Sequence, residues 1–234
     1  MIEKRPFESL GQFENDWLKA RYHFSFSDYR DPARVQWGAL RVWNDDRIKA
    51  KSGFGPHPHA DMEIITYVRT GAITHEDSMG NRGRTEAGDV QVMSAGSGVT
   101  HAEYNVEEEA TTLYQIWILP KERGGKPYWG AAKFPKTDRA GALVTLASGF
   151  AADQQAGALP IRQDARVLAA TLAPSQEVSH PLAPGRHAYL AVAKGAAEVN
   201  GVALGPRDGA AIRDEAELRI KASDDTEIVL VDSP

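Results

Sequence analysis

The feature that most constrains the fold is the alternation of short apolar runs with turn residues along nearly the whole chain. Runs such as ALRVWNDDRIKA and TLYQIWIL are separated by clusters of glycine, proline, asparagine and aspartate. Many short strands with frequent turn signals are typical of an antiparallel sandwich or barrel. The 21 glycines and 13 prolines are spread along the 234 residues and not collected in one linker. The sequence therefore predicts an all-β protein.

One segment interrupts this pattern. Residues 121–140, KERGGKPYWGAAKFPKTDRA, are basic, rich in glycine and proline, and poorly periodic. We predict a linker here that packs on the surface. Because the chain is long enough for two domains of roughly 110 to 120 residues each, we expect an N-terminal domain over 1–125 and a C-terminal domain over 126–234.

The two halves also resemble each other. Residues 67–93, beginning YVRTG, line up with residues 191–213, beginning AVAKG. Each segment reads as strand, glycine, strand, turn, polar stretch, glycine and strand. The first half alone carries clustered histidine and glutamate, so the pattern favours one functional half, one degenerate half and one metal ion per chain.

Composition excludes several classes of site and partner. The chain has no cysteine, which excludes disulfides, thiolate metal sites and cysteine nucleophiles. The formal net charge of −5 argues against direct nucleic-acid binding. No apolar run approaches the ~20 residues of a membrane helix, and the first residues show no secretory signal. We expect a cytoplasmic, monomeric protein.

The stretch GPHPHADME, residues 55–63, is the first candidate site. On a strand over 57–63, alternate side chains share one face, and these would be His57, His59, Asp61 and Glu63. The two prolines lack backbone donors, so they predict an edge strand that presents its imidazoles rigidly.

A second stretch, SAGSGVTHAEYN at 94–105, completes the set. Its glycines mark a tight turn before a strand on which His101 and Glu103 share a face. Two such pairs on neighbouring strands can hold one ion through His57, His59, His101 and Glu103. Glu63 remains as a spare carboxylate that could accept a substrate proton. The alternative is that these histidines line a polar loop or donate hydrogen bonds in the core.

A ligand set of nitrogen and oxygen with open positions suits a redox metal. Fe(II) is favoured for the single divalent ion, with Zn, Mn, Ni, Co or Cu as alternatives. The other histidines and several tryptophans receive structural roles. We expect His75 to be solvated beside a hairpin tip at 78–81, a packing or hydrogen-bonding role for His23, and structural roles for His180 and His187. Trp37, Trp43 and Trp117 lie in strand patterns and are expected in the core.

At these residues the chain resembles the cupin superfamily. The first cupin motif is matched by His57, His59, Glu63 and Gly71, with one residue more before the final glycine. The second is matched by Gly88, Gly96, His101 and Asn105, with serine in place of proline and a longer spacer before the histidine. Within the superfamily, the chain is similar to the pirin family, through the stretches HFSFSDYRDP, LRVWNDDRI, GFGPHPHADMEIITYV, HEDSMGN, GDVQVMSAGSGVTHAEYN and LYQIWILP.

This resemblance covers the first ~120 residues most specifically and implies a bicupin of two β-barrel or β-sandwich domains. It implies that His57, His59, His101 and Glu103 bind the metal and that Glu63 does not. It also implies a quercetin 2,3-dioxygenase, which cleaves flavonols with O₂ and releases carbon monoxide. The alternative is a metal-binding regulatory protein that acts through a protein partner, as eukaryotic pirin does.

Overall fold

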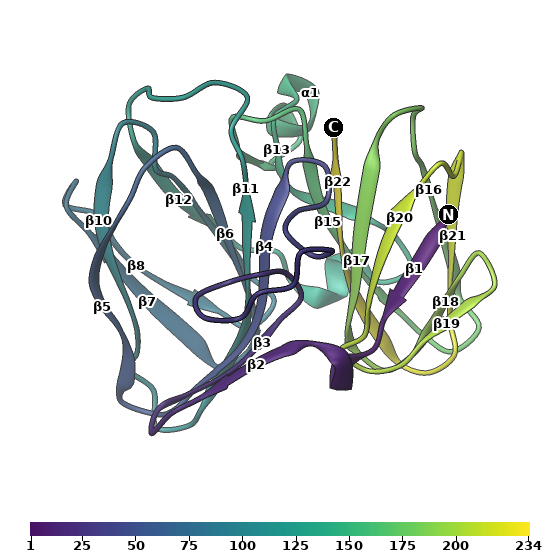
Figure 1. Cartoon of the computed structure of the whole chain (residues 1–234), viewed down its shortest axis with the longest axis horizontal. Coiled ribbons are helices and arrows are strands. Elements are labelled where there is room, and N and C mark those ends of the chain that lie inside the picture. Colours follow the sequence, from purple (N-terminus) through teal and green to yellow (C-terminus); the bar gives the residue numbers. More distant parts are fainter.

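The computed structural model describes residues 1–234 and consists of four β-sheets stacked in succession. Each half has one four-stranded and one seven-stranded sheet, and Figure 1 shows the two larger sheets side by side in the middle of the molecule. All strand pairs within the sheets are antiparallel except β13 with β14. The predicted all-β fold is confirmed, and the sheets pack as open sandwiches, not closed barrels.

The N-terminal half contributes most of two sheets. In sheet order, the large sheet contains β12 (Tyr128–Ala132), β9 (Val90–Ser94), β6 (Glu63–Thr70), β11 (Thr111–Ile118), β4 (Leu40–Ile48), β3 (Leu18–Tyr22) and β2 (Gly11–Glu14). The small sheet contains β5 (Ser52–His59), β10 (Val99–Asn105), β7 (Ala72–Asp77) and β8 (Arg82–Glu86).

The C-terminal half repeats this plan. Its large sheet contains β1 (Ile2–Arg5), β20 (Gly209–Arg213), β17 (His187–Lys194), β22 (Thr226–Ser233), β15 (Arg166–Leu172), β13 (Val144–Ser148) and β14 (Leu159–Pro160). Its small sheet contains β16 (Glu177–Pro181), β21 (Glu217–Ala222), β18 (Ala197–Val199) and β19 (Val202–Leu204). The helices are short: η1 (Phe7–Ser9), η2 (Lys136–Arg139) and α1 (Ala151–Gln155). None has the length and apolar character needed to span a bilayer.

The strand order confirms the internal repeat. The segment 67–93 runs from β6 to β9, and the segment 191–213 runs from β17 to β20. In both halves the first of these strands pairs with the last and the middle two form a hairpin in the small sheet. The predicted hairpin tip at 78–81 is also confirmed, because it joins β7 to β8.

Two strands cross between the halves. β1 pairs with β20 at the edge of the C-terminal large sheet, and β12, from the expected linker at 121–140, pairs with β9 at the equivalent edge of the N-terminal one. The linker is thus structured, contrary to its weak periodicity. The division at residue 125 stays a prediction, since each half completes its sheet with a strand from the other side of that position.

The faces of the sheets determine where the core lies. A cluster of 24 buried apolar residues fills the space between the two large sheets, with side chains such as Trp43, Tyr114 and Tyr189. A second cluster of 18 fills the C-terminal sandwich. The N-terminal sandwich has only smaller clusters of seven and four, so its interior is the place where a cavity can remain.

Close packing of β5 against β10 gives a test of this architecture. A Cβ added at Gly53 would lie 2.2 Å from the Glu103 carbonyl oxygen, whereas one at Gly55 meets nothing nearer than the Tyr104 hydroxyl at 3.6 Å. We expect Gly53→Ala to cost about 1–3 kcal/mol through overpacking and lower the melting temperature by about 3–10 °C. Gly55→Ala, on the same strand, is the control and should melt like the wild type in thermal unfolding. Equal melting of both variants would contradict the close approach of the two strands.

Candidate metal centre

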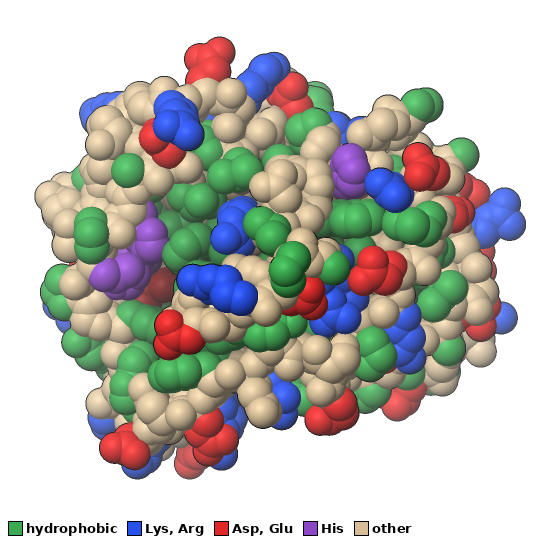
Figure 2. Space-filling model, in the orientation of Figure 1, with side chains coloured by type: hydrophobic (Ala, Val, Ile, Leu, Met, Phe, Trp, Pro, Cys, Tyr) green, Lys and Arg blue, Asp and Glu red, His purple; other side chains and the backbone are tan.

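The small N-terminal sheet brings the two histidine stretches together. β5 pairs only with β10, so the proline-flanked segment is an edge strand, as predicted. His57 lies directly opposite His101 in the register, and the turn before β10 uses Gly96 and Gly98 with positive φ angles of 50° and 139°. The side chains of His57 and His101 point into the N-terminal sandwich. Histidines gather at a hollow on the surface of this half (Figure 2).

Three imidazoles converge at one point. The ligand nitrogens of His57, His59 and His101 all lie within 4.8 Å of one another. Nε2 of His57 is 3.1 Å from Nε2 of His101. Two nitrogen ligands at right angles on a metal at ~2.1 Å would be about 3.0 Å apart, so this separation fits neighbouring positions on one ion.

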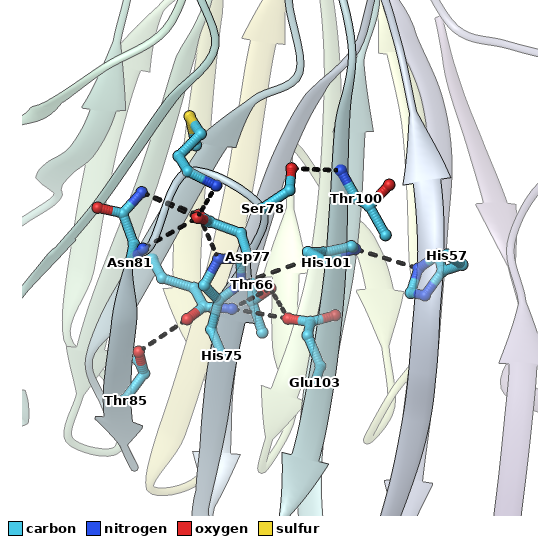
Figure 3. Close-up of polar contacts among 12 residues, drawn as sticks. His57, Thr66, His75, Asp77, Ser78, Asn81, Thr85, Thr100, His101 and Glu103 are labelled. Atoms are coloured by element: carbon cyan, nitrogen blue, oxygen red, sulfur yellow. Dashed lines mark hydrogen bonds and ion pairs between the residues drawn. The ribbon is translucent and has the colours of Figure 1, made fainter.

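Hydrogen bonds at the opposite ring nitrogens assign the tautomers. Nδ1 of His57 donates to the Gly55 carbonyl at 2.8 Å, which leaves a lone pair on Nε2. Nδ1 of His101 lies 3.3 Å from Nδ1 of His75, whose Nε2 donates to Asp77 Oδ2 at 2.9 Å (Figure 3). His101 is then the donor to His75, and its Nε2 also carries a lone pair. Two lone pairs that face each other at 3.1 Å repel, and a cation bound between them would remove this repulsion.

The third imidazole supports the same conclusion. Nε2 of His59 is buried and has no hydrogen-bond partner in the protein. Burial, with His101 and His57 nearby, lowers the pKa of His59 to about 4. Burial, with His57 and His75, lowers that of His101 to about 3. Both rings are therefore neutral at pH 7, the state in which imidazole binds metal ions.

Glu103 stands beside these rings and is held from the opposite sheet. Its ligand oxygen lies within 4.8 Å of the ligand nitrogens of His75 and His101. Oε1 accepts hydrogen bonds from Gln91 Nε2 at 2.6 Å and Thr66 Oγ1 at 3.1 Å, and Oε2 accepts one from Gln115 Nε2 at 2.6 Å. A carboxylate that accepts hydrogen bonds from three donors is fixed in orientation.

The three donors belong to a row of polar side chains that crosses the inner face of the large sheet. Strand register places five residues side by side in this polar row: Gln91, Thr66, Gln115, Asn44 and Tyr22. This row could not be predicted from the sequence, because its members lie on five strands and become neighbours only through strand pairing.

The C-terminal sandwich has an apolar row in the same place. Thr66 and Leu190 are equivalent positions, because each lies five residues before the glycine that follows β6 or β17. Strand register then gives the corresponding row in the C-terminal half: Ala210, Leu190, Leu230 and Leu168. All four are buried in the apolar cluster of that half. Both groups of clustered ligand side chains lie in the N-terminal half, in agreement with the predicted asymmetry.

The expected solvation of His75 is wrong. His75 is fully buried, stacks on Trp129 with ring centroids 5.0 Å apart, and connects Asp77 to His101. It lies within β7, where Ile73 and Asp77 share its face. The alternation of that strand was the signal for an inward-facing histidine, and proximity to the hairpin tip was misleading.

The expected single strand over 57–63 is also wrong. β5 ends at His59, Asp61 has a positive φ of 51°, and Glu63 begins β6 in the other sheet. Glu63 is 1% exposed and accepts hydrogen bonds from Ser94 Oγ and from the backbone N–H of Arg162. Burial raises its pKa. Glu63 is not among the residues that line the cavity at the histidines, so the structure does not bring it to the substrate side.

That cavity has a volume of about 440 Å³ and lies between the two N-terminal sheets. Six of its 18 lining residues carry aromatic rings that were not assigned to a cavity from the sequence: Phe13, Trp17, Tyr22, Phe26, Phe54 and Trp117. Trp117 was expected in the core, but it is half-buried and packs edge-on against His59 at 5.0 Å. Trp43 is fully buried as expected.

The remaining histidines have structural partners. His23 is fully buried, and its Nδ1 lies 2.7 Å from the Tyr189 hydroxyl. Nε2 of His180 donates to Asp232 at 2.9 Å, and the His187 ring packs edge-on against Trp37, which is half-buried. These positions confirm the expected packing and hydrogen-bonding roles.

Fold and cluster together define a bicupin protein with a metal-binding centre in one of its two domains. The family described as Pirin matches residues 3–118, and the quercetinase C-terminal cupin domain matches residues 146–233. The chain belongs to the pirin family.

Similar proteins agree over the full length. The chain is 60% identical to a pirin-like protein of Caulobacter vibrioides, over 100% of both chains. It is 40% identical to a quercetin 2,3-dioxygenase of Escherichia coli, over 100% of this chain and 99% of the relative. A crystal structure of the bacterial pirin YhhW from Escherichia coli in complex with nickel(II) superposes with a TM-score of 0.93 at 40% identity, covering 100% of this chain and 99% of that one.

The hydrogen bonds that link Asp77, His75 and His101 allow a test of whether His75 orients the His101 ring. His75→Phe keeps a ring against Trp129 but removes the acceptor for His101 Nδ1. Because partners of this kind orient metal-binding imidazoles, we expect metal affinity to fall about 10- to 100-fold. Competition with a chromophoric chelator measures this, and a melting curve of the metal-free variant verifies that it folds. Unchanged affinity in a folded variant would show that the hydrogen bond does not orient His101.

Proposed function

We propose that the chain is a metal-dependent dioxygenase that cleaves flavonols such as quercetin with O₂ and releases carbon monoxide. The observation that carries this proposal is the cavity, partly lined by aromatic side chains, with three converging imidazoles and an oriented carboxylate on one wall. The quercetin 2,3-dioxygenase named among its relatives supports the same reaction class. We also propose that the protein is cytoplasmic and monomeric.

In this proposal, one divalent ion is held by His57, His59, His101 and Glu103. Fe(II) suits this mixed set of nitrogen and oxygen ligands, and Ni(II) is a second candidate because a pirin was crystallised with it. Such an ion, when bound, supplies a Lewis acid for an enolate oxygen and redox chemistry with O₂.

The protein side chains bind and deprotonate the substrate. Trp117 and Phe54 line the cavity with aromatic rings against which a flat aromatic molecule could pack, and the cavity volume of about 440 Å³ lies in the range of small-molecule sites. Glu103 lines the cavity and Glu63 does not. We therefore assign acceptance of the flavonol 3-hydroxyl proton to a carboxylate oxygen of Glu103, whose amide donors hold it in place before the substrate arrives.

Turnover tests the reaction. The iron-loaded protein should consume O₂ with quercetin and release carbon monoxide, measured with an oxygen electrode and a haem-based carbon monoxide assay. The zinc-loaded protein should be inactive, because zinc has no redox chemistry. Absence of turnover across several flavonols and several redox metals would instead favour the regulatory function through a protein partner.

A pair of carboxylate variants tests the ligand assignment. Both carboxylate oxygens of Glu103 accept a hydrogen bond from an amide N–H, so the new amide nitrogen in Glu103→Gln would face a donor. The substitution also removes the negative charge of the metal ligand. We expect metal affinity to fall about 10-fold or more. Glu63→Gln keeps an acceptor for Ser94 and Arg162 and should retain the metal. Metal analysis after dialysis against a chelator distinguishes them, and the reverse pattern would refute the assignment.

A further inference from the structure

A second pair of polar side chains lines the same cavity from the opposite sheet. Asn44 and Asp46 lie two residues apart on β4, so both face inward, while the three histidines lie on β5 and β10. Asn44 continues the polar row from Gln115, and Asp46 pairs in register with Leu113 and Ala20. Neither residue belongs to the histidine cluster.

Both side chains hold a buried oxygen without a partner. Asn44 is 4% exposed and Asp46 is 2% exposed, and Oδ1 of each makes no hydrogen bond in the protein. An unsatisfied buried polar atom costs about 1–3 kcal/mol. The neighbouring Asp45 shows the contrast, because it faces away from the cavity and pairs with Arg69 and with Arg207 at 2.7 Å. Structural carboxylates on this strand are thus neutralised, and Asp46 is not.

The chemistry of this pair selects its ligand. Burial, with Asp45 and Glu103 nearby, raises the pKa of Asp46 well above its usual value, which favours the protonated form of its carboxyl. A carboxylic acid and an amide each offer a donor and an acceptor. The cavity lining contains no lysine or arginine, so a carboxylate or phosphate would find no cationic side chain here. A hydroxyl group, which also donates and accepts, fits the pair.

We propose that Asn44 and Asp46 bind a phenolic hydroxyl group of the substrate and make the cavity selective for polyhydroxylated, uncharged aromatic rings. This rests on the proposed function, since the metal-chelating oxygens of the same molecule would meet the histidine wall. A phenolic hydroxyl in the cavity would then find a donor and an acceptor on the Asn44 and Asp46 side chains that line it. The aromatic walls alone would accept an unsubstituted ring equally well.

Two flavonols separate this hydroxyl contact from metal chelation. Quercetin and 3-hydroxyflavone both carry the 3-hydroxyl and 4-carbonyl groups, but 3-hydroxyflavone has no other hydroxyl. Zinc-loaded protein avoids turnover, and quenching of tryptophan fluorescence reports binding, because Trp17 and Trp117 line the cavity. We expect wild type to bind quercetin at least about 10-fold more tightly, equivalent to ~1.4 kcal/mol.

Substitution at Asp46 should remove this preference. Asp46→Leu is expected to bind the two flavonols within about 3-fold of each other with unchanged affinity for 3-hydroxyflavone, and Asp46→Asn should retain most of the preference because it keeps a donor and an acceptor. Asn44→Leu gives a second, independent variant. Arg47→Leu, on the same strand but exposed, is the control and should behave as wild type.

The melting temperature of Asp46→Leu distinguishes ligand binding from a structural role of Asp46, because loss of a structural residue would lower it. Since Asp46→Leu removes a buried oxygen without a partner, we expect its melting temperature to equal or exceed that of wild type. Full retention of the quercetin preference in folded Asp46→Leu and Asn44→Leu overturns this proposal and leaves the dioxygenase function standing. Failure of zinc-loaded wild type to bind either flavonol overturns both.

Discussion

The hydrogen bonds from Gln91, Thr66 and Gln115 to the Glu103 carboxylate are the interaction on which the N-terminal half depends. They join the small sheet to the large one across an interior that apolar side chains do not fill. Without such a tie, a carboxylate between two sheets would lose its solvation and gain nothing in return. With it, the two walls of the cavity keep a fixed separation, and the imidazoles of β5 and β10 meet at one point. Preorganisation of this kind is what a binding site requires from its scaffold.

The two halves show how one fold can be used in two ways. Leu190, Leu230 and Leu168 fill the C-terminal sandwich at the positions that the polar row occupies in the N-terminal half. The filled half gains the stability of a closely packed interior. The hollow half gives up part of that stability for a cavity with unsatisfied oxygens, as is common at functional sites. The shared core between the large sheets then stabilises both halves together.

Sequence patterns predicted what depends on local chemistry. The short strands, the edge strand at His57 and His59, the glycine turn before His101 and the inward face shared with Glu103 all follow from alternation and turn residues. What depends on strand pairing was missed. The polar row exists only because register aligns residues up to 93 positions apart, from Tyr22 to Gln115. Glu63 was misplaced because a single positive φ at Asp61 moves the chain into the other sheet. His75 was expected in solvent because it lies near a hairpin tip, but its position on the inward face of β7 buries it.

The crossing of β1 and β12 has a consequence for the order in which the protein is made. All four proposed ligands have been translated once residue 103 is added, but the sheet behind them lacks its edge strand until β12 (Tyr128–Ala132) follows. The other face of that sheet, with Trp43 and Tyr114, is fully covered only when Val229 and Val231 of the last strand are in place. The centre therefore acquires its rigid support only when synthesis of the chain is complete, and we expect capture of the ion to be a late, post-translational event.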